Sequence, residues 1–144
     1  MIARHAILFP LLAYVLLTAV VSIVMYRRRV AEMRARQLRP QQVATAAQMS
    51  TQLQDTGPAD NFRNLFETPV LFVAAMITIY AASLTSLPYV VLAWLYIATR
   101  VAHSAIHCTY NKVMHRMRAF LASLIVLWVT WALIGNDLLA LGRG

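Results

Sequence analysis

The sequence predicts an all-α membrane protein, built as a bundle of four transmembrane helices. Two observations predict this class. First, 60% of the 144 residues are hydrophobic and only 12% are charged, whereas soluble domains carry about 25% charged residues. Second, each of four apolar runs approaches the ~20 residues needed to cross the hydrocarbon of a bilayer. The runs cover residues 7–26, 69–87, 89–106 and 119–141.

The first helix is expected over about residues 5–38, because helix-forming residues continue the apolar run until Pro40 stops the helix. Its arginines follow the apolar run instead of preceding it, so the run is a retained span and not a secretory signal. A polar connector covers about residues 40–59 and ends in a turn signal at residues 55–58.

The second helix is expected over about residues 60–86, with Asp60 or Asn61 as its N-cap. Pro69 lacks an amide hydrogen and frees the carbonyl of Leu65, which predicts a local bend. A membrane helix tolerates such a bend when a neighbour satisfies the carbonyl.

The third and fourth helices are expected over about residues 89–111 and 117–141, which completes a single domain over residues 1–144. The third helix places four polar residues on one face, at offsets of three, four and four. They are Arg100, His103, His107 and Asn111. The fourth helix is apolar and is expected to act as scaffold.

Positive charge is concentrated in two loops. Arg27, Arg28, Arg29, Arg34, Arg36 and Arg39 follow the first span, and Lys112, His115, Arg116 and Arg118 lie between the last two spans. The positive-inside rule therefore places both loops in the cytoplasm and both termini on the other side, and we expect a bacterial inner membrane. The arginines abut a span and lack interleaved aromatics, which favours lipid headgroups over nucleic acid. Cys108 is expected to be a packing residue.

Arg63, Asn64 and Glu67 fall in the first turns of the second helix, at the membrane boundary. A charge there requires a partner, and Glu67 is predicted to pair with Arg100 of the antiparallel third helix. A purely structural pair that fixes helix register is the alternative reading.

Several polar groups remain after that pair, and they converge on the same leaflet. They are Arg63, Asn64, His103, His107 and Arg116. This set predicts a cationic pocket for a small polyanion, in which a guanidinium would draw a bound thiol toward its thiolate. Two histidines and Glu67 form a conceivable metal set, but the arginines would repel a dication, and no metal is expected. For His107 a packing role is the alternative, and a transporter is disfavoured because no pair of broken helices is present.

The pattern Arg63-Asn64-x-x-Glu67-Thr68, followed by Arg100-x-x-His103 and Arg116, resembles the MAPEG family, membrane-associated proteins in eicosanoid and glutathione metabolism. The similarity covers most of the chain. It implies a homotrimer with glutathione bound between neighbouring subunits.

The resemblance also implies roles for individual residues. Arg63, Asn64 and Glu67 would bind glutathione, with Arg100, His103 and His107 completing the site and Arg116 stabilising the thiolate. Arg118 is the alternative to Arg116. By the same resemblance, Arg28 corresponds to an arginine that the family has at the end of the first helix. Arg27 and Arg29 fit that position as well.

Three positions depart from the pattern that the resemblance implies. His107 and Phe120 stand where tyrosines are usual, and Met117 replaces a serine found in some members. The resemblance implies a glutathione S-transferase or peroxidase that acts on lipophilic substrates arriving from the lipid. The alternative is a non-catalytic membrane protein whose polar cluster stabilises the oligomer or binds a lipid headgroup.

Overall fold

The computed structural model describes residues 2–143, and these residues form an all-helical protein without strands. Four helical segments are long and apolar enough to cross a membrane, over residues 4–35, 57–81, 87–108 and 113–141. The predicted fold class is therefore confirmed. The first segment contains a continuous α-helix of 28 residues, Leu8–Ala35. At about 1.5 Å per residue, this helix is about 42 Å long. That length exceeds the ~30 Å hydrocarbon core, so one end projects beyond it.

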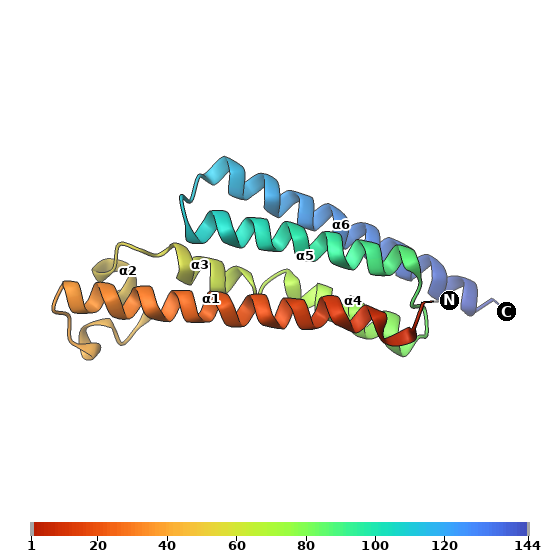
Figure 1. Ribbon diagram of the computed structural model, residues 1–144, viewed down its shortest axis with the longest axis horizontal. Coiled ribbons are helices and arrows are strands. Elements are labelled where there is room, and N and C mark those ends of the chain that lie inside the picture. The colour runs from red at the N-terminus through yellow and green to blue at the C-terminus, as the bar shows by residue number, and fades with distance from the viewer. Residues whose placement is uncertain (1, 144) are drawn as a thin grey trace.

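The elements follow one another in a simple order. They are η1 (Arg4–Ile7), α1 (Leu8–Ala35), η2 (Pro40–Val43), α2 (Ala46–Gln52), α3 (Gly57–Asn64), α4 (Pro69–Ala81), α5 (Leu87–Cys108) and α6 (Val113–Leu141). Helices α5 and α6 form an antiparallel hairpin beside α1 (Figure 1). The chain between α1 and α3 and the turn between α5 and α6 lie at one end of the molecule, here named the connector end, while both termini lie at the other.

Several helix boundaries differ from the predicted ones. The first helix ends at Ala35 and not at residue 38, and the second span ends at Ala81 and not at residue 86. The second span begins at Gly57 and not at residue 60, because Pro58 occupies the first turn of α3, where a missing amide hydrogen costs nothing. Helix α5 ends at Cys108, and Asn111 follows it with a positive φ of 46°. Helix α6 begins at Val113, so Arg116 lies in its first turn and not in a loop.

The predicted bend before Pro69 is a complete break between α3 and α4. Two carbonyls that the break leaves without helical partners are satisfied by side chains from other helices. The hydroxyl of Tyr14 donates to the carbonyl of Leu65, and Nη2 of Arg100 donates to the carbonyl of Asn64 at 3.2 Å. A side chain of α1 thus meets the condition under which a membrane helix tolerates a bend at Pro69.

An aromatic cluster packs beside this break and joins three helices. The rings of Phe72 and Tyr96 stack with centroids 4.3 Å apart and an interplanar angle of 12°, and Tyr14 meets Phe72 edge to face at 6.0 Å. All three side chains are buried. Offset stacking and edge contacts of this kind add to the stability gained from burial, so the break is held by a rigid core.

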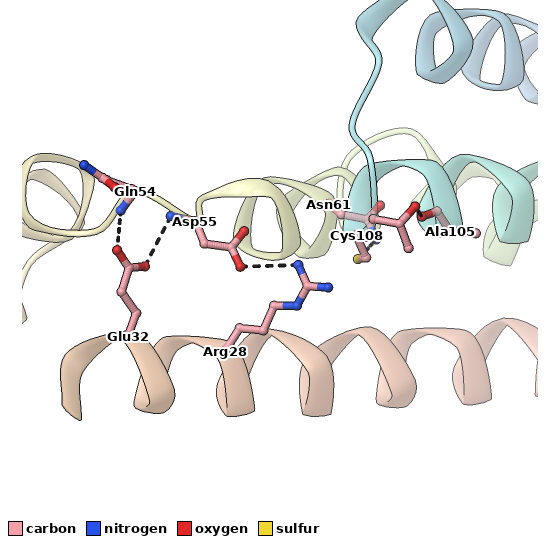
Figure 2. Close-up of polar contacts among 8 residues, drawn as sticks. Arg28, Glu32, Gln54, Asp55, Asn61, Ala105 and Cys108 are labelled. Atoms are coloured by element: carbon pink, nitrogen blue, oxygen red, sulfur yellow. Dashed lines mark hydrogen bonds and ion pairs between the residues drawn. The ribbon is translucent and has the colours of Figure 1, made fainter. Parts of the chain in front are cut away.

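Polar side chains on the projecting part of α1 hold the connector (Figure 2). The carboxylate of Glu32 accepts from the backbone N–H of Gln54 at 2.7 Å and of Asp55 at 3.2 Å. Nη1 of Arg28 forms an ion pair with Oδ2 of Asp55 at 3.3 Å. We call Arg28 and Glu32 the clasp, because they fix the chain just before α3 begins.

Close packing then sets the position of α3 against α5. A Cβ atom on Gly57 would lie 2.8 Å from the backbone oxygen of His107, a separation that only glycine permits. One turn later the fully buried Asn61 accepts from the hydroxyl of Ser104 at 3.2 Å and donates to the sulfur of Cys108 at 3.5 Å. Figure 2 shows Asn61 and Cys108 side by side, and these contacts fix which side of α3 faces α5.

Candidate functional site

A cavity of about 240 Å³ opens where the end of α3 meets α5 and the first turns of α6. Its lining combines polar and apolar side chains. They are Asn64, His103, Val113, Arg116, Met117 and Phe120. The structure therefore brings together three residues that the sequence predicts for one site, Asn64, His103 and Arg116. Below, this space is called the first cavity.

Arg116 enters the first cavity from the first turn of α6, and its guanidinium is held from one side. Nη1 donates to Oδ1 of Asn111 at 2.9 Å and to Nε2 of His107 at 3.2 Å. Asn111 belongs to the α5–α6 turn and His107 to the last turn of α5. The turn and the helix end thus determine the position of the charged group.

His103 ties the backbone of the same residue to α5. Its Nδ1 lies 3.1 Å from the carbonyl oxygen of Arg116, and since a carbonyl only accepts, Nδ1 carries the hydrogen. In the neutral imidazole Nε2 is then an acceptor, and it is buried without a hydrogen-bond partner among residues 2–143. His103 is only 2% exposed but lines the first cavity, so a ligand there would contact its imidazole.

The predicted ion pair between Glu67 and Arg100 is wrong for the single chain. The side chain of Arg100 is fully buried, donates to the Asn64 carbonyl, and lies 5.8 Å from the centre of the Phe120 ring. Glu67 is exposed and takes part in neither of the two ion pairs formed by residues 2–143. The break after Asn64 explains this difference, because residues beyond it no longer follow the helical face that carries Asn64.

Arg63 lies on another side of α3 and lines a separate, second cavity of about 90 Å³ between α1, α2 and α3. Consecutive residues of a helix point about 100° apart, so Arg63 and Asn64 face different spaces. Arg29 of α1 and Asp60 of α3 line the second cavity as well, and Met25, Met49 and Leu53 supply its apolar wall. The two cavities share no lining residue.

Among the three consecutive arginines of α1, Arg28 points to the connector and forms the ion pair with Asp55. Arg29 reaches the second cavity, and Arg27 is exposed. Arg118, the alternative to Arg116, is also exposed and does not line the first cavity. The structure thus separates candidates that the sequence leaves equivalent.

The arginines that line the two cavities form no ion pair within the described chain. Both ion pairs of the described chain, Arg28 with Asp55 and Arg36 with Glu32, belong to α1 and the connector. Arg63, Arg100 and Arg116 have no carboxylate oxygen within 4.0 Å among residues 2–143. In the same part of the chain, no group of three or more histidine, cysteine or acidic residues could hold a metal ion. The guanidinium of Arg116, which has no carboxylate partner among residues 2–143, lines the first cavity and can bind an anion there.

Sequence reasoning gave no role to Asn111, although its place one turn after His107 on the polar face was the available signal. It also missed Val113 as a lining residue. For Tyr14 no signal exists, because a single tyrosine inside an apolar span has the appearance of ordinary packing.

The four spans and a polar site at one end of the bundle define a multi-pass integral membrane protein. Within that class, the model of the MAPEG family matches residues 7–136, and the chain belongs to the MAPEG family. Membership makes this a membrane protein of the family associated with glutathione and eicosanoid metabolism. No curated protein and no solved structure matches the chain.

Proposed function

We propose that the protein binds glutathione and presents its thiolate to lipophilic electrophiles or peroxides, as a glutathione S-transferase or peroxidase. The observation that carries this proposal is the first cavity, in which Arg116 has no carboxylate partner among the described residues. A guanidinium in a poorly hydrated site favours the charged form of a nearby thiol and lowers its pKa. The nucleophile would be the thiolate of the co-substrate, and the protein would supply orientation and charge.

The polar wall of the first cavity suits a peptide with carboxylates. Arginine presents a planar set of donors that matches a carboxylate, and the amide of Asn64 can both donate to and accept from a peptide group. Val113, Met117 and Phe120 form the apolar wall of the same cavity. An apolar second substrate would approach the thiolate along this wall from the lipid.

The separation of the two cavities supports a homotrimer with shared sites. Asn64 and Arg116 line the first cavity and Arg63 lines the second, so the residues proposed to bind one glutathione are divided within a protomer. A ligand can contact both sets when the first cavity of one protomer faces the second cavity of its neighbour. The exposed apolar side chains of α6, among them Leu121, Ile125 and Trp128, would pack against neighbouring protomers or lipid.

We place the connector end in the cytoplasm of a bacterium, and both termini on the outer side of its inner membrane. Both termini lie together at the opposite end (Figure 1). The arginine-rich end of α1 and the α5–α6 turn lie at the connector end, which agrees with the positive-inside rule. Cytoplasmic glutathione would then reach the site directly.

The proposal is tested by titrating the detergent-purified protein with glutathione, while heat and ultraviolet thiolate absorbance are recorded. We expect binding by the wild type with a thiolate signal at neutral pH. Arg116→Ala should lose most of that signal, because a neighbouring cation shifts a thiol pKa by about 1 to 3 units. Arg118→Ala is the matched control, since it removes an exposed arginine two residues away, and should behave as wild type.

Two results would contradict the proposed enzymatic activity. If the wild type releases no heat with glutathione, the binding proposal fails. If it binds without a thiolate signal, the site holds a ligand but does not activate it. That second result favours the non-catalytic alternative, in which the polar cluster stabilises the oligomer or binds a lipid headgroup. The observation that favours this alternative is Phe120, which lines the first cavity and has no side-chain hydrogen-bond donor.

A further inference from the structure

Arg116 is held at both ends of the residue by groups from α5 and the α5–α6 turn. His103 binds its backbone carbonyl at 3.1 Å, while His107 and Asn111 bind the same terminal nitrogen, Nη1, of its side chain at 3.2 and 2.9 Å. The two hydrogens of Nη1 lie in the guanidinium plane. Two acceptors on that nitrogen therefore fix both the position and the plane of the charged group.

This arrangement leaves the other donors of Arg116 available. A guanidinium has five N–H groups, and those of Nε and Nη2 have no hydrogen-bond partner among residues 2–143. Because Arg116 lines the first cavity, these groups are the ones left for a ligand. An unrestrained arginine would lose rotational freedom on binding, and this loss of side-chain entropy would weaken the binding of the ligand.

Both acceptors are uncharged. The amide oxygen of Asn111 is neutral, and His107 accepts through Nε2, so its hydrogen resides on Nδ1. A carboxylate at either position would orient the guanidinium but would also compensate its charge. Neutral acceptors orient the group and leave its full charge to act on a ligand.

The backbone explains how Asn111 reaches Arg116. Its φ of 46° is left-handed, a conformation that asparagine tolerates better than most residues, and its N–H bonds to the carbonyl of Ile106 at 2.9 Å. This turn ends α5 and directs the amide oxygen toward α6. His107 does not line the first cavity, so it acts on a ligand through Arg116 and not by direct contact.

We propose that His107 and Asn111 are positioning residues that fix the guanidinium of Arg116 with its free donors toward the first cavity. This inference rests on the proposed function for the identity of the ligand, but the restraint on Arg116 exists without ligand. In this arrangement His107 accepts a hydrogen bond from the guanidinium of Arg116. The inference assigns no proton transfer to either residue.

The first test is magnetic resonance of the side-chain nitrogens in full-length protein carrying isotope-labelled arginine, in detergent and without glutathione. Arg116 is identified as the signal lost in Arg116→Lys. Restraint of Nη1 should slow rotation about the Cζ–Nε bond, so that the two terminal nitrogens give separate signals. His107→Phe keeps a ring without the acceptor, and Asn111→Gly permits the left-handed backbone without the amide. Each should merge the two signals.

Two further variants separate positioning from simple structural damage. His107→Gln provides a neutral acceptor at a similar reach and should keep the signals separate. His115→Ala removes an exposed histidine that contacts Tyr110 and should have no effect. Merged signals in the wild type, or separate signals in both His107→Phe and Asn111→Gly, would overturn the inference.

The second readout is the ratio of thiolate to thiol in bound glutathione, measured by ultraviolet absorbance across pH. We expect His107→Phe and Asn111→Gly to lower this ratio at neutral pH by roughly tenfold, with the apparent thiol pKa raised accordingly, and His107→Gln to restore it. If the wild type binds no glutathione, the proposed function fails, while the nitrogen signals still decide whether Arg116 is restrained. If glutathione binds and the ratio does not change in either variant, positioning is refuted.

Discussion

Tyr14 and Arg100 show how single side chains stabilise a broken helix in an apolar environment. Lipid offers no hydrogen bonds, so carbonyls released between α3 and α4 need partners from the protein. The hydroxyl of Tyr14 binds the Leu65 carbonyl, and the guanidinium of Arg100 binds the Asn64 carbonyl. Since Asn64 also lines the first cavity, these two contacts are structural requirements of the site.

We predict that Tyr14→Phe destabilises the protein, because it removes the hydroxyl and leaves the buried Leu65 carbonyl without its partner. An unsatisfied buried polar group costs about 1 to 3 kcal/mol. The midpoint of thermal unfolding in detergent should fall. Tyr26→Phe makes the same chemical change at a side chain that is 67% exposed and should leave the midpoint unchanged. Equal midpoints for all three proteins would show that the Tyr14 hydroxyl contributes nothing.

At the scale of helices, the clasp links the projecting end of α1 to the connector and so to the start of α3. Glu32 accepts two backbone N–H groups and also pairs with Nε of Arg36 at 3.0 Å. Arg36 in turn donates to the carbonyl of Gln52 at 3.2 Å. The second cavity depends on this link, because the connector and α3 provide much of its wall.

We predict that Glu32→Ala loosens the connector without unfolding the spans. The backbone amides of Gln54 and Asp55 lose a charge-assisted acceptor, and such bonds contribute about 1.5 to 3 kcal/mol. Hydrogen exchange measured by mass spectrometry should therefore speed up roughly tenfold or more in the peptide that contains residues 54 and 55. Arg34→Ala, which removes an exposed arginine of the same helix, is the control. Unchanged exchange at Gln54 and Asp55 would contradict a stabilising role for the clasp.

The helices also show what the sequence can and cannot predict. Apolar runs located all four spans, and Pro69 located the break, because both signals are local. The pairing of Glu67 with Arg100 was predicted wrongly, since it assumed that one helical face continues past the break. The choice among Arg27, Arg28 and Arg29 depends on how α1 rotates against the connector. That rotation follows from tertiary packing, which periodicity alone does not determine.

For the whole molecule, the main consequence of the structure is that the predicted site is divided. Arg116 and Asn64 line the first cavity, and Arg63 lines the second, on another side of α3. The sequence places Arg63 and Asn64 next to each other and therefore suggests a single wall. Helical geometry separates them, so under the proposed function one glutathione contacts both residues only when it lies between two protomers. Under the proposed function, oligomerisation is therefore a condition of glutathione binding.

The most direct test of this claim is glutathione binding by mixed oligomers. Arg63→Ala impairs the second cavity and Arg116→Ala impairs the first, and each variant carries a different affinity tag. Both variants are expressed together, oligomers that contain both are isolated through the two tags, and calorimetry measures their binding. We predict weak binding by each variant alone and one site of wild-type affinity in each mixed trimer, where an intact first cavity faces an intact second cavity. Mixed oligomers that bind as weakly as either variant alone would contradict a site shared between protomers.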